Sequence, residues 1–130
     1  PEVLILDEPT AGLDPRGRDE ILGEISRLRE KTGMTILLVS HSMEDVANYV
    51  NRIIVMNKGS VLFDGEPKSV FSHVKELEEI GLAAPQVTYI MHSLKEAGLG
   101  PRTAGSVSTI TEAAETIAAA LQSGRGTGKC

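Results

Sequence analysis

The sequence contains no tryptophan, a single cysteine and few aromatic side chains of any kind. Two tyrosines and two phenylalanines are the aromatic residues among 130, so a folded core must consist mainly of aliphatic side chains. Cys130 has no partner for an internal disulfide, which fits a reducing compartment. No stretch approaches the roughly 18 consecutive apolar residues of a membrane-spanning helix, and the first residues lack the pattern of a secretory signal. We therefore expect neither a membrane span nor a signal peptide.

Basic residues are in the minority. The 13 lysines and arginines are outnumbered by 18 aspartates and glutamates, which gives a formal net charge of −5. A general nucleic-acid-binding protein needs the opposite balance. The sequence therefore predicts no nucleic-acid partner, and all of the acidic surplus lies in residues 1–66.

The first forty residues have the pattern of a strand, a helix and a second strand. Val3–Leu6 is a continuous apolar run, which is typical of a strand buried on both faces of a parallel sheet. Asp14 is a good N-cap for a helix that begins at Pro15 and runs to about Lys31. A second buried strand is expected over Thr35–Val39. This βαβ unit predicts an α/β fold with a parallel sheet.

A short helix and a hairpin are predicted next. Ser42 and Asp45 have the spacing of a capping box at the start of a short helix. Two apolar runs, Ile53–Met56 and Val61–Phe63, flank a turn that contains Gly59, as in a β-hairpin. We therefore expect the sheet to end in antiparallel strands.

Helical patterns dominate the second half of the chain. Short helices are expected over residues 67–71 and about 74–80, and Pro85 is predicted to open a longer helix. Thr109 and Glu112 have the spacing of a capping box for a last helix. The predicted apolar faces of the two longer helices are Val87, Ile90, Met91 and Leu94 on the first, and Ala114, Ile117, Ala118 and Leu121 on the second.

These patterns predict three parts. Residues 1–66 are expected to form the α/β part, and residues 67–122 a helical extension. Residues 123–130 are rich in glycine and poor in apolar side chains, so we expect a tail that is disordered or was added for expression.

Two adjacent acids, Asp7 and Glu8, stand at the carboxyl end of the first predicted strand. Ligands of open α/β sheets bind at such strand ends. Neighbouring strand residues point in opposite directions, so one acid can approach a cation such as Mg²⁺ while the other addresses a second group. A solvated strand end that happens to be acidic is the alternative, and these two residues alone do not separate the two interpretations.

A longer motif points to one family. Residues 4–15, LILDEPTAGLDP, closely resemble the Walker B motif and the following D-loop of ABC-type ATPases, and residues 38–42, LVSHS, look like their switch-histidine segment. The resemblance implies that Asp7 helps to bind Mg²⁺, usually through water, and that Glu8 polarises or deprotonates the water that attacks ATP. It also implies that His41 contacts the γ-phosphate and that Asp14 lies in a loop that crosses to the opposite ATPase subunit. A metal ligand, a water-orienting acid and a phosphate contact form a coherent set for phosphoryl transfer.

Other motifs of this family do not occur in the 130 residues. We find no G-x-x-x-x-G-K-[ST] phosphate loop, no LSGGQ-type signature and no glutamine loop. The run GRGTGK at residues 124–129 is not a phosphate loop, because Ser123 stands where the first glycine belongs and Cys130 where serine or threonine belongs. The resemblance therefore implies the C-terminal part of a P-loop nucleotide-binding domain, beginning at Walker B, with a small helical C-terminal extension. This part alone is expected to bind ATP weakly and to hydrolyse almost none.

The second half of the chain resembles one particular group of ABC-type ATPases. Residues 65–71 resemble the end of importer-type ATPase domains, and residues 80–87 with the helix after Pro85 look like the C-terminal extension of energy-coupling-factor (ECF) transporter ATPases. That resemblance implies an ATPase that energises uptake of vitamins or transition-metal ions from the cytoplasmic face of the cell membrane. Its partners would be a second ATPase subunit, identical or related, a membrane coupling protein and a substrate-binding membrane subunit. The helical extension would support ATPase pairing or simply pack as a cap.

Two other interpretations remain open. The chain could belong to a different ABC system, either a conventional importer or a protein without a membrane partner. It could also be a non-catalytic dimerisation module. His73 and His92 are expected to face solvent, and we expect no acid or cysteine at ligand spacing from His92.

Overall fold

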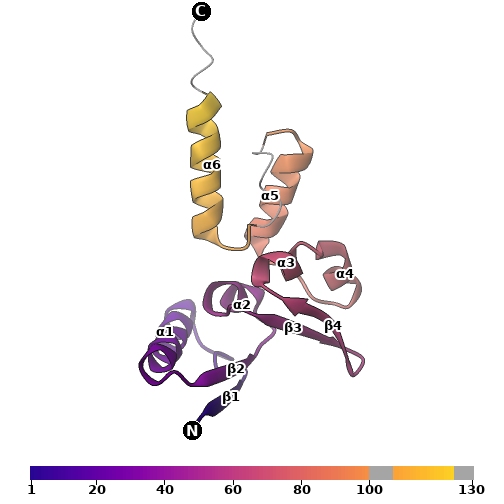
Figure 1. Ribbon diagram of the computed structural model, residues 1–130. Helices are drawn as coiled ribbons and strands as arrows, with labels where there is room; N and C mark the ends of the chain where they lie inside the picture. Colours follow the sequence, from indigo (N-terminus) through magenta and orange to yellow (C-terminus); the bar gives the residue numbers. More distant parts are fainter. Residues whose placement is uncertain (100–106, 125–130) are drawn as a thin grey trace, which may run out of the picture. The chain divides into compact units, whose positions relative to one another are not determined.

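The computed structural model describes residues 1–99 and 107–124 (Figure 1). The chain divides into two compact units, Pro1–Tyr49 and Val50–Cys130. The predicted division after residue 66 rests on the change from strand to helix patterns, and it stays a prediction. No helix in the described parts of the chain is both long and apolar enough to cross a membrane.

The first unit is the predicted βαβ arrangement followed by a short helix. Strand β1 (Val3–Asp7) leads into helix α1 (Pro15–Thr32), which is followed by strand β2 (Thr35–Val39) and helix α2 (Met43–Tyr49). The two strands pair in parallel from Val3 with Thr35 to Asp7 with Val39. Helices α1 and α2 contact each other. The predicted parallel pairing is therefore confirmed.

Helix α1 begins and ends where the sequence predicts. The Asp14 side chain accepts a hydrogen bond from the backbone N–H of Gly17, and Pro15 occupies the first helical turn. At the other end, Gly33 has a φ of 68° and donates its N–H to the carbonyl of Arg29. Glycine reaches this left-handed conformation without steric cost, so both limits of the helix follow from local chemistry.

The sheet of the first unit leaves one face open, so the prediction that both strands are buried on both faces is wrong. Leu4 and Leu6 are half-buried, and so are their β2 partners Ile36 and Leu38. The side chains that alternate with them are exposed, Ile5 to 64%. A continuous apolar run is buried on both faces only where both faces are covered. The described residues of this unit provide only two helices, and they leave one face without cover.

The second unit opens with the predicted hairpin. Strand β3 (Ile53–Asn57) pairs antiparallel with strand β4 (Ser60–Gly65), with a bulge between Val55 and Met56. The two turn residues, Lys58 and Gly59, both have positive φ angles, of 49° and 79°, as the favoured two-residue hairpin turn requires. Among the described residues, β3 and β4 pair only with each other, as β1 and β2 do. The expectation of one sheet ending in antiparallel strands is therefore not met.

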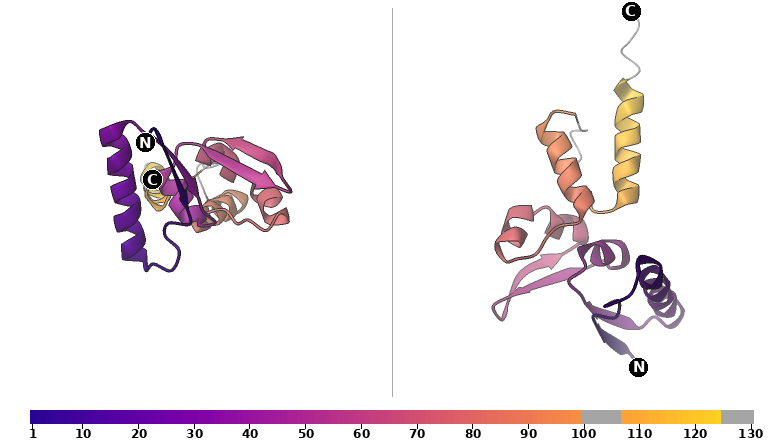
Figure 2. Two further views of the ribbon diagram at one scale, coloured as in Figure 1. Left: turned by 90° about the horizontal axis from the view of Figure 1, so that it is seen from below. Right: turned by 180° about the vertical axis from the view of Figure 1, so that it is seen from behind.

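Helices make up the rest of the second unit. Two short ones, α3 (Pro67–Phe71) and α4 (Val74–Glu79), are followed by α5 (Gln86–Glu96) and α6 (Ile110–Gly124). Helices α5 and α6 lie side by side in the views of Figures 1 and 2. Their contact is a small apolar core made of Met91 and Ala113, with Val87, Leu94, Val107 and Ile117 packed against it.

The faces of these two helices differ in part from the predicted ones. On α5, Ile90 is exposed. On α6, the predicted Ile117 packs inward together with Ala113, which was not predicted, whereas Ala114 and Ala118 are exposed. Leu121 is exposed as well. The predicted stripes assumed that each helix is covered along its whole apolar face, whereas α5 and α6 cover only part of each other.

The end of α6 also corrects the predicted tail. The helix continues through Ser123 and Gly124, and the Ser123 hydroxyl donates to the carbonyls of Ala119 and Ala120 at 3.0 Å. These two residues are therefore helical. The remainder of the predicted tail, residues 125–130, lies outside the described residues.

Candidate functional site

The carboxyl ends of β1 and β2 lie at the same edge of their sheet, because the strands are parallel and in register. Asp7, the last residue of β1, is the partner of Val39, the last residue of β2. The next residue, Glu8, donates its backbone N–H to the carbonyl of Val39 at 2.8 Å. His41 follows two residues after β2. The loop after β1 and the loop after β2 are thereby brought to one sheet edge, as expected for a ligand site of this fold class.

Glu8 and His41 meet through their side chains. His41 Nδ1 lies 2.8 Å from Glu8 Oε1. Because a carboxylate can only accept, this contact requires a proton on Nδ1, and the ring donates to Glu8. The His41 side chain is 81% exposed and the Glu8 side chain 32% exposed. The second ring nitrogen, Nε2, therefore stands on the far side of the ring from Glu8 on an exposed side chain.

Glu8 has an unusual backbone conformation. Its φ of 46° lies in the left-handed region, which residues other than glycine rarely adopt. Such conformations persist where neighbouring contacts hold them, and they are frequent at functional sites. Here the N–H of Glu8 is bonded to Val39, and its carbonyl accepts from the N–H of Ala11 at 3.1 Å. The chain thus leaves the strand direction at the residue whose side chain meets His41.

Asp7 is exposed at the end of β1. Within residues 1–99 and 107–124, no group of three or more histidine, cysteine, aspartate and glutamate side chains could hold a metal ion. Mg²⁺ is often bound by only one or two carboxylates, with substrate phosphates and waters completing its shell. An exposed carboxylate such as that of Asp7 suits this mode of binding, and its role as a metal ligand stays a prediction.

Asp14 stands at the end of the same loop. Its Oδ1 accepts the N–H of Gly17 at 2.8 Å, which confirms the predicted N-cap. The capping hydrogen bond is exposed. The second role predicted for Asp14, a contact with an opposite subunit, stays a prediction.

A second connection between the two loops is not predicted by the sequence pattern. The hydroxyl of Thr10 donates to Asp45 Oδ2 at 3.1 Å, and both residues are buried. The expected capping box is only half formed, because the Ser42 hydroxyl accepts the N–H of Asp45 at 3.4 Å while the Asp45 carboxylate turns to Thr10. A threonine in a turn and an acid in the first turn of a helix are common in sequences. Only the pairing of β1 with β2 brings them together.

The other two histidines belong to the second unit, whereas the predicted site residues belong to the first. The ring of His73 is stacked on Phe63, with ring centroids 4.5 Å apart, so it does not simply face solvent. His92 is exposed as expected. The expectation that no acid stands at ligand spacing from it is wrong, because Glu96 Oε2 lies 3.7 Å from its Nδ1 one helical turn further on.

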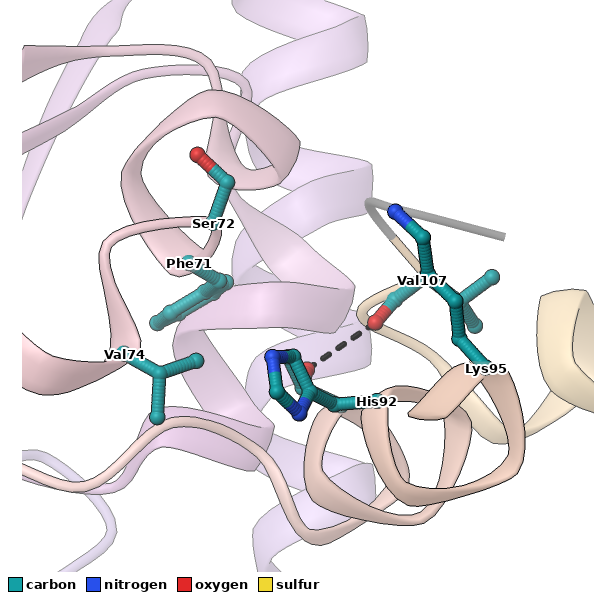
Figure 3. Close-up of a pocket in the computed structure, with 7 residues that line it drawn as sticks. Phe71, Ser72, Val74, His92, Lys95 and Val107 are labelled. Carbon is teal, nitrogen blue, oxygen red and sulfur yellow. Dashed lines mark hydrogen bonds between the residues drawn. The ribbon is translucent and has the colours of Figure 1, made fainter. Parts of the chain in front are cut away.

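A small cavity in the second unit includes His92 (Figure 3). Its volume is about 50 Å³, space for a water molecule or two, whereas pockets for small-molecule ligands usually measure about 300–1,000 Å³. The cavity includes none of the predicted site residues. Its lining residues are Phe71, Ser72, Val74, Thr88, His92, Lys95 and Val107.

Several curated proteins with similar sequences carry the description energy-coupling factor transporter ATP-binding protein EcfA2. The protein from Clostridium tetani is 68% identical over 98 residues, which are 75% of this chain and 34% of that protein. The protein from Clostridioides difficile is 50% identical over 131 aligned residues, which cover 100% of this chain and 44% of that protein. The chain thus spans 34% to 44% of the length of these curated relatives. No family model matches the chain.

Two solved structures have a similar fold. CbiO1 from Clostridium perfringens, described as part of the ABC transporter complex cbiONQ, superposes with a TM-score of 0.54 at 38% identity over 71% of this chain and 37% of its own. The ATP-binding cassette MJ1267 of an ABC transporter superposes with a TM-score of 0.53 at 32% identity over 60% of this chain and 32% of its own. The α/β fold is therefore that of part of an ABC ATPase domain, as the resemblance of residues 4–15 implied.

Proposed function

We propose that this chain, a homologue of the energy-coupling factor transporter ATP-binding proteins over part of their length, provides the water-activating half of an ATPase site. The observation that carries the proposal is the 2.8 Å contact between Glu8 and His41 at the sheet edge. An acid and a histidine from two loops converge there on the exposed carboxyl ends of parallel strands. The protein would couple ATP hydrolysis to uptake of vitamins or transition-metal ions.

Glu8 is the residue that receives the proton. Water attacks the γ-phosphorus of ATP, the bond from that phosphorus to the oxygen of ADP breaks, and the Glu8 carboxylate accepts a proton of the attacking water. A partly exposed side chain can reach a water molecule, and the hydrogen bond from His41 fixes one of its two oxygens. The other oxygen is left to orient the water.

His41 holds the transferred phosphate. With Nδ1 donating to Glu8, the ring directs Nε2 away from that acid. A protonated Nε2 donates a hydrogen bond to an oxygen of the γ-phosphate, where negative charge must be stabilised in the transition state. One ring thus orients the acid on one side and the phosphate on the other.

Asp7 would hold Mg²⁺, directly or through water. The bound cation would offset the charge of the phosphate oxygens. Asp7 is the last residue of β1 and Glu8 directly follows it, so these two adjacent side chains would bind the metal and the attacking water at the same sheet edge.

The proposed partners are a second ATPase subunit, identical or related, a membrane coupling protein and a substrate-binding membrane subunit. The curated relatives are described as transporter ATP-binding proteins, which supports partners in a transporter complex. The proposed position is peripheral, at the cytoplasmic face of the cell membrane. Asp14 would face the second ATPase subunit from the loop before α1. The exposed apolar side chains of α6, Ile110 and Leu121, are available for pairing.

Substitution of Glu8 tests the proposal. The protein is purified as its gene encodes it, and Mg²⁺-dependent phosphate release and ATP binding are measured for the parent and Glu8→Gln. Glu30→Gln, on the exposed side of α1, is the matched control. We expect Glu8→Gln to lose most hydrolysis while keeping ATP binding, and Glu30→Gln to match the parent. Unchanged hydrolysis in Glu8→Gln would contradict the role of Glu8.

The same measurements separate the alternatives. A parent protein that forms a defined dimer but neither binds nor hydrolyses ATP would favour a non-catalytic dimerisation module. Copurification with a membrane coupling protein would distinguish an ECF system from another ABC system. The isolated 130-residue chain, which contains no phosphate-loop pattern, is expected to bind ATP weakly and to hydrolyse almost none.

A further inference from the structure

We propose that Thr10 and Asp45 are positioning residues, which hold the two loops that carry Glu8 and His41 in register with each other. The proposal rests on the ATPase function proposed above. Neither residue touches Glu8 or His41 through a hydrogen bond of its side chain. They act on the site through the backbone of the loops.

The two residues stand close to the site in sequence and face each other in space. Thr10 lies two residues after Glu8, and Asp45 lies four residues after His41, in the first turn of α2. Their side chains are joined by the 3.1 Å hydrogen bond across 35 positions of sequence. Thr10 is 5% exposed and Asp45 8% exposed, so the hydrogen bond is shielded from water. A shielded hydrogen bond is stronger than one in water and costs more to break.

The contact between Glu8 and His41 cannot fix the loops by itself. The His41 side chain is 81% exposed, and exposed charged pairs contribute little, because water competes for both partners. A histidine on a loop also has many alternative positions. The geometry at the sheet edge therefore needs a support that does not depend on that contact, and the Thr10–Asp45 hydrogen bond is buried and connects the same two loops.

Each end of this bond is tied to local backbone structure. On the first loop, the carbonyl of Thr10 accepts the N–H of Leu13 at 3.2 Å, and the carbonyl of Glu8 accepts the N–H of Ala11. On the second, the N–H of Asp45 donates to the Ser42 hydroxyl. Ser42 directly follows His41. A shift of either loop would therefore be resisted by a turn on one side and by the start of α2 on the other.

The bond also stabilises the fold, so the test must separate the two roles. Loss of the Thr10 hydroxyl leaves a buried carboxylate without this donor, which destabilises a protein wherever it occurs. A second buried threonine provides the matched control. Thr88 is 7% exposed, and its hydroxyl donates to the carbonyl of Val107 at 2.9 Å in the second unit. Thr88→Val likewise replaces a buried hydroxyl with a methyl group and removes a similar hydrogen bond, but in a unit that contains neither of the two loops.

The experiment compares Thr10→Val, Thr10→Ser, Asp45→Asn and Thr88→Val in the protein as its gene encodes it. The measured quantities are kcat and KM for ATP hydrolysis, the Kd for ATP and the melting temperature. We expect Thr10→Val to lower kcat about 10- to 100-fold, as loss of alignment does, with the Kd for ATP within about twofold of the parent. Thr10→Ser keeps the donor and should retain kcat within about twofold. Asp45→Asn keeps shape and one acceptor oxygen and should lower kcat by several-fold.

The control decides between the two roles. If Thr10→Val and Thr88→Val lower the melting temperature to a similar extent and only Thr10→Val lowers kcat, the positioning role is supported. If Thr10→Val keeps the parent kcat, or if Thr88→Val loses as much, the positioning role is wrong. Should Thr10→Val not fold, Asp45→Asn answers the same question by the same criterion. Full hydrolysis in Glu8→Gln, measured in the same series, would instead overturn the proposed function.

Discussion

Glu8 Oε1 and His41 Nδ1 lie 2.8 Å apart, although 33 positions of sequence separate the two residues. Parallel pairing of β1 with β2 makes this contact possible, because it places the ends of both strands at one edge. The left-handed backbone of Glu8 and its hydrogen bond to Val39 then set the direction of the acid. The first prediction below follows from this contact, and the next two follow from local interactions at the end of α1 and in the β3–β4 hairpin.

Removal of the histidine ring should slow catalysis strongly without unfolding the protein. His41→Ala is expected to lower kcat for ATP hydrolysis roughly 100-fold, the usual loss when one donor to the transition state is removed. Because the side chain is exposed, the free energy of unfolding should change by no more than about 0.5 kcal/mol. Steady-state kinetics and urea unfolding measure the two quantities. His92→Ala, at an exposed histidine of α5, is the control and should keep the parent rate.

The end of α1 depends on a glycine. Gly33 has a φ of 68° with open space around the position of a Cβ, so Gly33→Ala adds strain but no clash. We expect a loss of about 1–2 kcal/mol in the free energy of unfolding. Gly23→Ala, inside the same helix, meets only the far end of Arg27 and should raise stability by about 0.5–1 kcal/mol. Equal effects of the two substitutions in urea unfolding would be inconsistent with the left-handed cap.

The hairpin carries an acid whose contribution depends on pH. Hydrogen bonding from Arg52, which approaches Asp64 at 2.8 and 2.7 Å, holds the pKa of the Asp64 carboxyl below its ordinary value of 3.8. Because the folded-state pKa is the lower one, the stabilisation is present above pH 3.8 and is lost as the pH falls through the lowered pKa. Asp64→Asn should therefore lower the melting temperature at pH 6. The gap to the parent should narrow below pH 3.8, and a gap that stays constant down to pH 2.5 would contradict the assignment.

Local patterns predicted most of the fold. The limits of α1 followed from Asp14, Pro15 and the glycine after the helix, and β2 was predicted over its full observed range. The site residues Glu8 and His41 were also predicted from sequence, and the structure brings them together. Such features depend on residues close together in the chain, or on a strand order that the βαβ pattern already implies.

Features that depend on packing against residues distant in the sequence were harder to predict. The apolar runs of β1 and β2 read as strands buried on both faces, yet Ile5 is 64% exposed because nothing described covers its side of the sheet. On α6, Ala113 is buried against Met91 of α5, whereas Leu121 is exposed. The bond between Thr10 and Asp45 joins two common residue types across 35 positions. No periodicity or spacing in the sequence encodes that pairing.

The rate of Mg²⁺-dependent phosphate release by Glu8→Gln tests the central claim most directly, measured at an ATP concentration at which nucleotide binding to both proteins is shown to be saturated. The amide keeps the size of the side chain but cannot accept the proton of the attacking water. The account predicts a rate at least about 100-fold below the parent, within the range that a general base contributes. A Glu8→Gln protein that saturates with ATP and releases phosphate at the parent rate would contradict it.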